Sequence, residues 1–249
     1  MDGTHATANR NPDGLRLIIH ETLDSTNEEA RRLAEKGERG PLWILASCQT
    51  AGRGRRGRNW ISEEGNLFAT LLLNPQGDKA HWPQLGFAMA LGTAEMLEAY
   101  TSATEVKLKW PNDVLVQGRK IAGILLEAYG DALAIGVGVN LKSAPEGTEF
   151  PAISFERATG NAPDPQSALA VLAGRMHAWY EVWCEQGFHP LKRAWLARAY
   201  GLGGPMTARL ANEELNGVFE ALDEDGALML RMADGAHRRV TAADIFLPG

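Results

Sequence analysis

Cysteine is scarce in this chain of 249 residues, which contains two, Cys48 and Cys184. They lie far apart in the sequence, and neither has partners at a metal-ligand spacing. This pattern excludes a disulfide framework and a cysteine-based metal site, and it is typical of proteins from a reducing compartment. We therefore expect two reduced cysteines and a cytoplasmic protein.

Long apolar runs are also missing. The longest apolar stretch, residues 85–100, is shorter than the roughly 18 uninterrupted residues of a membrane span, and small or charged residues interrupt it at Gly86, Gly92, Thr93, Glu95 and Glu98. The first 14 residues are polar and lack the apolar segment of a secretory leader. The sequence therefore predicts no membrane partner, with residues 1–14 as a flexible tail.

Positive charge is in deficit: 31 Asp and Glu face 25 Lys and Arg, for a formal net charge of -6. Non-specific nucleic-acid binding requires many phosphate neutralisations over a broad basic surface. The balance therefore predicts no nucleic-acid partner. The 45% hydrophobic content is sufficient for a buried core.

The positive charge that is present is concentrated in one segment, residues 49–60. It reads Gln-Thr-Ala-Gly-Arg-Gly-Arg-Arg-Gly-Arg-Asn-Trp, with four arginines and three glycines. Glycine allows close approach of a ligand to the main chain, and each guanidinium offers a planar set of donors that fits a phosphate or a carboxylate. This segment, which we call the arginine loop, is predicted to bind an anion.

Hydrophobic periodicity predicts alternating strands and helices around this loop. Strands are expected at 15–20, 43–48, 67–73, 106–110, 113–117, 120–128 and 133–140, the last four forming an antiparallel meander. Helices are expected at 24–36, where Ser25 and Glu28 have the spacing of a capping box, at 83–100, and at 165–200 with a break near 187–190. Short strands at 206–211, 215–222, 227–232 and 237–241, separated by turn sequences, predict a small β-barrel.

Four segments together resemble the biotin protein ligases, also called biotin–[acetyl-CoA-carboxylase] ligases. They are Asp24-Ser-Thr-Asn27, the arginine loop, Lys109-Trp-Pro-Asn-Asp113 and Gly118-Arg-Lys-Ile-Ala-Gly-Ile-Leu125. The resemblance implies an α/β (α+β) fold, with a mixed, largely antiparallel sheet and helices on one side, plus a C-terminal SH3-like barrel. The domains expected in this chain are a catalytic domain at residues 15–200 and the barrel at residues 205–249. Because only about 14 residues precede the first predicted strand, we expect a ligase without the helix-turn-helix repressor module of many members.

The resemblance implies a reaction in two steps. Biotin and ATP first form biotinyl-5'-AMP and pyrophosphate, and a lysine of a biotin carboxyl carrier protein then takes the biotinyl group. Cations must hold the two reacting anions together, so arginines, a lysine and Mg²⁺ are expected at one place. The family also includes homodimers, so a homodimer is one expected state.

Position by position, the motifs imply roles for individual residues. Biotin contacts are implied for Ser25, Thr26, Asn27, Gln49, Arg53, Gly54, Arg55, Lys120 and Gly123, with Gly138 as a second glycine beside the ring. Contacts to ATP or the adenylate are implied for Arg53, Arg55, Arg56, Arg58, Trp60, Asn112, Lys120 and Asn140. Catalytic roles are implied for Lys120, Arg55 and Asp113, with Asp113 receiving a proton from the acceptor lysine. The motifs identify no metal ligands.

Two alternatives remain open from the sequence. A lipoate-protein ligase or lipoyl transferase would share the fold, and the transferase would require a nucleophilic cysteine. Cys48 lies within an apolar strand pattern that is more typical of a packed residue. A non-enzymatic nucleic-acid-binding regulator could use residues 53–58, although the acidic composition argues against it.

Overall fold

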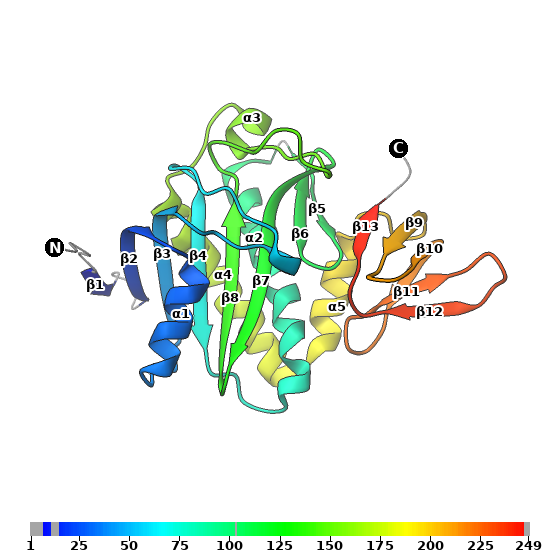
Figure 1. Ribbon diagram of the computed structural model, residues 1–249, viewed down its shortest axis with the longest axis horizontal. Helices are drawn as coiled ribbons and strands as arrows, with labels where there is room; N and C mark the ends of the chain where they lie inside the picture. The colour runs from blue at the N-terminus through cyan, green and yellow to red at the C-terminus, as the bar shows by residue number, and fades with distance from the viewer. Residues whose placement is uncertain (1–6, 11–14, 103, 247–249) are drawn as a thin grey trace.

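The computed structural model describes residues 7–10, 15–102 and 104–246, and it contains two β-sheets with helices between and beside them (Figure 1). The strands of the large sheet are β1 (Thr7–Arg10), β2 (Arg16–Leu23), β3 (Leu42–Gln49), β4 (Leu67–Leu73), β5 (Val106–Lys109), β6 (Asp113–Val116), β7 (Arg119–Tyr129) and β8 (Ala132–Val139). Their order in space is β1-β2-β3-β4-β8-β7-β6-β5. The pair β2 and β3 is parallel and every other neighbouring pair is antiparallel. The predicted meander is confirmed, because β5 to β8 pair in chain order.

Helices lie on both faces of this sheet. The helices are α1 (Thr26–Glu35), α2 (Leu85–Tyr100), α3 (Phe155–Thr159), α4 (Pro165–Gln186) and α5 (Phe188–Ala197), with short 3₁₀ turns η1 (Arg55–Gly57) and η2 (Lys79–Gln84). In Figure 1, α1 lies in front of the sheet, whereas α2 and α4 lie behind it.

The two faces have separate apolar cores. Alternate residues of the strands point to opposite faces, so Ile44 and Leu72 pack with α1, whereas Leu45 and Leu71 join the larger core with α2 and α4. The expectation of helices on one side is therefore correct for α2 and α4 but wrong for α1. The central strands have helices packed on both faces of the sheet, which explains why all seven residues of β4 are buried.

Helix boundaries follow local signals with two exceptions. The predicted break in the long helix is confirmed at Gly187, whose φ of 71° separates α4 from α5. The predicted capping box is wrong: Ser25 is the N-cap of α1, but its side chain makes no capping hydrogen bond. The helix predicted from Pro83 begins instead at Leu85, because the preceding residues form η2.

The second sheet contains the last five strands and packs beside α5. They are β9 (Pro205–Arg209), β10 (Glu214–Leu222), β11 (Leu228–Arg231), β12 (His237–Val240) and β13 (Asp244–Phe246), in the order β12-β11-β10-β9-β13 and all antiparallel. The Trp195 ring of α5 lies 6.5 Å from Phe219 of β10 and 5.5 Å from Phe87 of α2, between centroids. This aromatic contact joins the two sheets' cores.

The N-terminal segment differs from the expected tail. Thr7–Arg10 form β1 and pair with β2 at the edge of the sheet. The rest of the predicted tail, residues 1–6 and 11–14, lies outside the described residues. Within the part of the chain that is described, no helix is both long enough and apolar enough to cross a membrane.

Candidate functional site

A cleft of about 330 Å³ opens on the α1 face of the large sheet, over the middle of β7 and β8. The N-terminus of α1, the arginine loop and residues of β13 surround it. Its walls include all of the predicted site residues except Arg56. Segments that are far apart in the sequence therefore meet in one site, as the motifs predicted.

One end of the cleft is a network of neutral polar groups at the start of α1. The side-chain oxygen of Gln49 accepts hydrogen bonds from the Thr26 amide at 2.8 Å and from its hydroxyl at 3.2 Å. Thr70 on β4 places its hydroxyl 2.8 Å from Thr26 Oγ1 and 2.7 Å from Asn27 Oδ1. The Ser25 hydroxyl makes no hydrogen bond within the described residues, so it is available to a ligand at a helix N-terminus.

The floor of the cleft is backbone, because glycines line the facing strands. Gly123 of β7 pairs with Gly138 of β8. A Cβ atom on Gly138 would lie 2.5 Å from the Trp60 ring, and one on Gly123 would lie 2.9 Å from it. The indole therefore rests directly on this glycine floor. Its Nε1 is buried and has no hydrogen-bond partner among the described residues.

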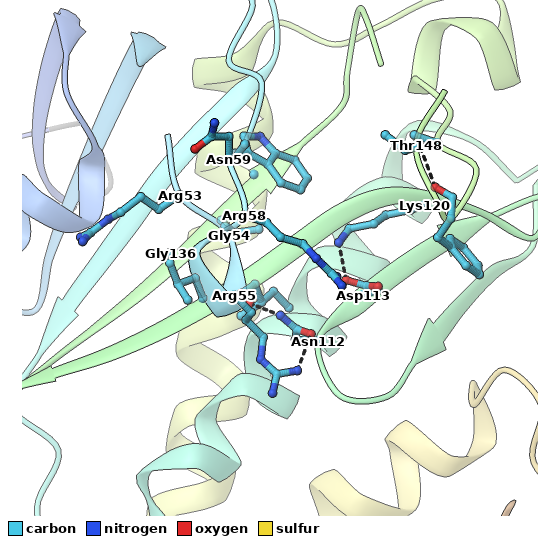
Figure 2. Close-up of a pocket in the computed structure, with 18 of the residues that line it drawn as sticks. Arg53, Gly54, Arg55, Arg58, Asn59, Asn112, Asp113, Lys120, Gly136 and Thr148 are labelled. Carbon is cyan, nitrogen blue, oxygen red and sulfur yellow. Dashed lines mark hydrogen bonds and ion pairs between the residues drawn. The ribbon is translucent and has the colours of Figure 1, made fainter. Parts of the chain in front are cut away.

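The other end of the cleft carries charge. Figure 2 shows Lys120 directed at Asp113, and Lys120 Nζ lies 2.6 Å from Asp113 Oδ1. Lys109 Nζ lies 3.5 Å from the second oxygen, Oδ2, of the same carboxylate. Two ammonium groups therefore face one carboxylate, and this end of the cleft favours an added anion.

Three arginines of the loop, Arg53, Arg55 and Arg58, point in different directions (Figure 2). Arg53 is directed away from Lys120, and its guanidinium pairs with Glu28 at 3.1 Å and with Glu127 at 3.3 Å. Arg55 is half-buried and donates to Asn112 Oδ1 at 3.3 Å. Burial lowers the pKa of the Arg55 guanidinium.

Arg56 and Arg58 reach the second sheet instead. Their guanidinium groups lie 3.0 Å and 2.7 Å from Asp244 Oδ2 of β13. Arg56 has a φ of 55°, in the left-handed region that residues other than glycine seldom occupy. Arg58 lines the cleft, whereas Arg56 does not.

The two predicted asparagines hold the cleft walls. Asn112 donates to the carbonyl of Ile124, whose amide donates to the carbonyl of Asn112 at 3.0 Å. Asn140 is 2% exposed. Its backbone amide donates a hydrogen bond to the carbonyl of Ile121 at 2.8 Å. The side chain of Cys48 donates to the carbonyl of Ser62, and the residue does not line the cleft.

Sequence reasoning missed several residues of the cleft. Lys109 is the first residue of the Lys109-Trp-Pro-Asn-Asp113 motif, but the motif implied no binding or catalytic role for it. Gly136 and Asp244 were not singled out, and Gly136 is needed because a Cβ there would lie 2.2 Å from Asn27 Oδ1. The alternating glycines of residues 134–140 are a local signal that could have identified Gly136. No local signal identifies Asp244.

The sequence matches two family models. Residues 19–142 match the biotin/lipoate A/B protein ligase family, and residues 201–247 match the biotin protein ligase C-terminal domain. The two matched ranges contain most of the residues that line the cleft, and the rest lie between residues 145 and 152.

Individual relatives resemble the chain over most of its length. A biotin–[acetyl-CoA-carboxylase] ligase of Paracoccus denitrificans is 44% identical over 237 residues, which cover 91% of this chain and 98% of the relative. The bifunctional ligase/repressor BirA of Bacillus subtilis is 32% identical over 246 residues, which cover 94% of this chain and 74% of the relative.

Solved structures have the same architecture. The biotin protein ligase from Aquifex aeolicus in complex with biotin and ATP has a TM-score of 0.83 and 30% identity, with 93% of this chain and 99% of that chain covered. The biotin protein ligase from Leishmania major in complex with biotinyl-5-AMP has a TM-score of 0.66 and 25% identity, with 93% and 100% covered.

Proposed function

Because this chain belongs to the biotin protein ligase family, we propose that its cleft binds biotin and ATP side by side and retains the biotinyl-5'-adenylate formed from them. The chain is an ATP-dependent biotin–[acetyl-CoA-carboxylase] ligase. The first step joins the biotin carboxylate to the α-phosphate of ATP and releases pyrophosphate. The second step transfers the biotinyl group to a lysine of a carboxyl carrier protein and releases AMP.

In our proposal, biotin lies along the cleft with its ring system at the α1 end. This end offers the hydroxyls of Ser25 and Thr26 and the side-chain amide of Gln49. These groups match the hydrogen-bond donors and acceptors of a ureido ring. Asn27 fixes the network by donating to Glu127 at 2.8 Å. The ring system then rests on the glycine floor at Gly123 and Gly138, in the space that the Trp60 indole occupies here.

The biotin carboxylate and the α-phosphate then meet at the charged end. Lys120 and Arg55 both line the cleft, and in our proposal they screen the charge that develops as one anion attacks the other. Gly54 lets the loop approach the ligand closely. Trp60, once displaced from the glycine floor, stacks on the nucleotide.

Further nucleotide contacts come from the walls and the loop. Arg58, Asn112 and Asn140 all line the cleft. Arg53 and Arg56 are paired with carboxylates at its margins, Arg53 with Glu28 and Arg56 with Asp244. They contact the nucleotide in our proposal only after these pairs open.

Asp113 serves the second step. Its carboxylate accepts a proton from the acceptor lysine, which must be neutral before it attacks the adenylate. The position of Asp113 beside Lys120 supports this role, because the acyl group bound at Lys120 would then lie within reach of both.

The cation, the partners and the domains remain proposals. Mg²⁺ would supply charge screening for the ATP phosphates. Among the described residues, no three His, Cys, Asp or Glu side chains gather as metal ligands, so phosphates and water would hold most of the ion. We propose a carboxyl carrier domain as the partner, with no nucleic-acid partner, and a cytoplasmic location. The proposed domains are residues 15–200 and 205–249, and a homodimer is one possible state.

The observation that carries this proposal is the meeting of a neutral hydrogen-bonding end and a cationic end across one glycine floor. The direct test is transfer of labelled biotin to a purified carrier domain with ATP and Mg²⁺, beside lipoate and beside a control without ATP. ATP-dependent transfer of biotin is expected. Transfer of lipoate in its place would contradict the assignment of the α1 end to a ureido ring.

The role of Arg55 has its own test. Replacing Arg55 by Ala should reduce the rate of adenylate formation about 100-fold or more, since one preorganised cation is removed from the developing charge. Arg193→Ala is the matched control, because Arg193 is exposed on α5 and makes no ion pair within the described residues. The measurement is pyrophosphate release together with retention of the adenylate on the protein. Equal rates and equal retention in both variants would count against the assignment.

A further inference from the structure

Lys109 is a buried cation beside the proposed catalytic carboxylate. It is the last residue of β5, and its side chain is 6% exposed. The ammonium lies 4.5 Å from the centroid of the Phe150 ring and 3.5 Å from Asp113 Oδ2. Burial lowers the pKa of Lys109. Burying an ammonium is costly unless it is paired, so this placement requires a reason.

The strand register explains how the three charged groups meet. Lys109 of β5 pairs directly with Asp113 of β6, and Asp113 pairs with Gly123 of β7. Lys120 lies near the start of β7 and reaches the same carboxylate. The two lysines approach from opposite sides of β6, and each takes a different oxygen.

The two lysines differ in access to the cleft. The Lys120 side chain is 27% exposed, whereas that of Lys109 is 6% exposed. An anionic ligand can therefore draw Lys120 away from Asp113, while Lys109 stays behind the carboxylate. Asp113 Oδ1 is then freed toward the ligand, and Oδ2 keeps its cation.

We propose that Lys109 is a positioning residue for biotin transfer: it anchors Asp113 through Oδ2, so that Oδ1 faces the acceptor lysine after Lys120 has turned to the adenylate. This inference rests on the proposed role of Asp113. In the step itself, the acceptor ammonium gives one proton to Asp113 Oδ1, and the neutral nitrogen attacks the acyl carbon. The bond between that carbon and the phosphate oxygen breaks, and AMP leaves with the electron pair. The attacking nitrogen loses its second proton to water to give the amide, and Asp113 later releases the first proton to water.

The charged groups around Lys109 come from three other elements. They are Asp113 on β6, Lys120 on β7 and Asp244 on β13. Removing the Lys109 charge therefore changes the field at Asp113 as well as its position, and a test must separate transfer from adenylate formation.

The variants are Lys109→Met, which keeps the length of the buried side chain without its charge, and Lys109→Arg, which keeps the charge. Lys107→Met is the matched control, because Lys107 lies two residues earlier on β5 and pairs with the exposed Glu105. Asp113→Asn tests the proposed base separately. Thermal unfolding of each variant checks the fold.

Three rates are measured for each variant: pyrophosphate release without carrier, reaction of the preformed adenylate with hydroxylamine, and its transfer to a carrier domain between pH 6 and pH 9. Hydroxylamine is already neutral at neutral pH and needs no base. For Lys109→Met we expect transfer to fall roughly 10- to 100-fold, with the other two rates kept. The deficit should shrink as pH rises, because more acceptor lysine is then neutral, and Lys109→Arg should recover part of the rate.

Each other outcome is informative. Equal losses in adenylate formation and in transfer would overturn the inference, because Lys109 would then act on the ligand anions. Full transfer by Lys109→Met, with transfer lost in Asp113→Asn, would overturn the role inferred for Lys109 and leave the proposed role of Asp113 standing. Full transfer by Asp113→Asn would overturn the proposed role of Asp113 itself. If Lys109→Met does not fold, Lys109→Arg carries the test. A partial loss of transfer that shrinks as pH rises, with the other two rates kept, supports the inference, whereas unchanged transfer or a loss equal in all three rates overturns it.

Discussion

At the scale of single residues, the absence of a side chain decides the shape of the cleft. Gly138 and Gly123 leave room for a flat ring against the strands, and the Trp60 indole fills that room here. Trp60 Nε1 is buried without a partner among the described residues, which is a costly arrangement. A ligand that releases the indole from the floor recovers that cost.

Replacing Gly138 by Ala should weaken biotin binding at least about tenfold. The new methyl group would lie 2.5 Å from the Trp60 indole, in the space that we assign to the biotin ring system. Titration calorimetry with biotin measures the effect. Gly174→Ala is the matched control, since a Cβ there meets nothing within 4 Å. That change in the α4 interior should stabilise the protein by about 0.4–1 kcal/mol. Equal biotin affinities in the two variants would contradict the proposed floor.

At the scale of elements, the N-terminus of α1 is held by Asp24. Its carboxylate accepts from the Ser25 amide at 2.7 Å and makes two hydrogen bonds of 2.8 Å with Arg32. The Arg32 guanidinium lowers the pKa of Asp24 from 3.8 to about 2. This arrangement leaves the Ser25 hydroxyl free for the cleft, since Asp24 orders the turn.

The Asp24 contact should stabilise the fold in a pH-dependent way. A carboxyl whose pKa is lower in the folded state contributes stability above its unfolded pKa, and that contribution is lost as pH falls toward the folded value. Asp24→Asn should therefore be less stable than the wild type at pH 7, by less than about 1 kcal/mol because the pair is partly screened by solvent. The difference should narrow below about pH 4.

Urea unfolding from pH 7 to pH 3 measures this difference. Glu64→Gln provides the control, because Glu64 is exposed and forms no ion pair in the described part of the chain. A stability difference for Asp24→Asn that stays constant over this range would contradict the assignment to Asp24.

At the scale of the whole molecule, the arginine loop joins the two sheets. Arg56 and Arg58 both contact Asp244, which follows Arg56 by 188 positions. Arg58 also lies 3.9 Å from Glu149, whose carboxylate pairs with Arg209 of β9 at 2.7 Å. The second sheet thereby provides an anionic support for the loop that covers the cleft.

Removing this support should loosen the loop. In Asp244→Ala, cleavage by trypsin within residues 53–58 should become about two to five times faster, which corresponds to about 0.5–1 kcal/mol for a partly exposed ion pair. Asp225→Ala is the control, because Asp225 pairs with Arg239 inside the second sheet. The bound adenylate should also dissociate faster from Asp244→Ala. Equal cleavage rates in the two variants would show that the contact does not hold the loop.

The sequence by itself determined the local features of this protein. Alternation and turn residues predicted the meander from β5 to β8, and glycine predicted the break between α4 and α5, because these signals act between near neighbours in the chain. The prediction that the arginine loop binds an anion rests on near neighbours in the chain for the same reason. Glycines allow close approach of a ligand and guanidinium groups donate hydrogen bonds to an anion, wherever the fold places the loop.

Only the tertiary structure decided where these features meet. It placed α1 on the face opposite α2, laid Trp60 on the glycine floor, and paired Asp113 with two lysines from different strands. It also gave Arg58 a partner in β13. Such contacts depend on how layers pack and how strands register across long separations, and no local pattern of residues encodes them.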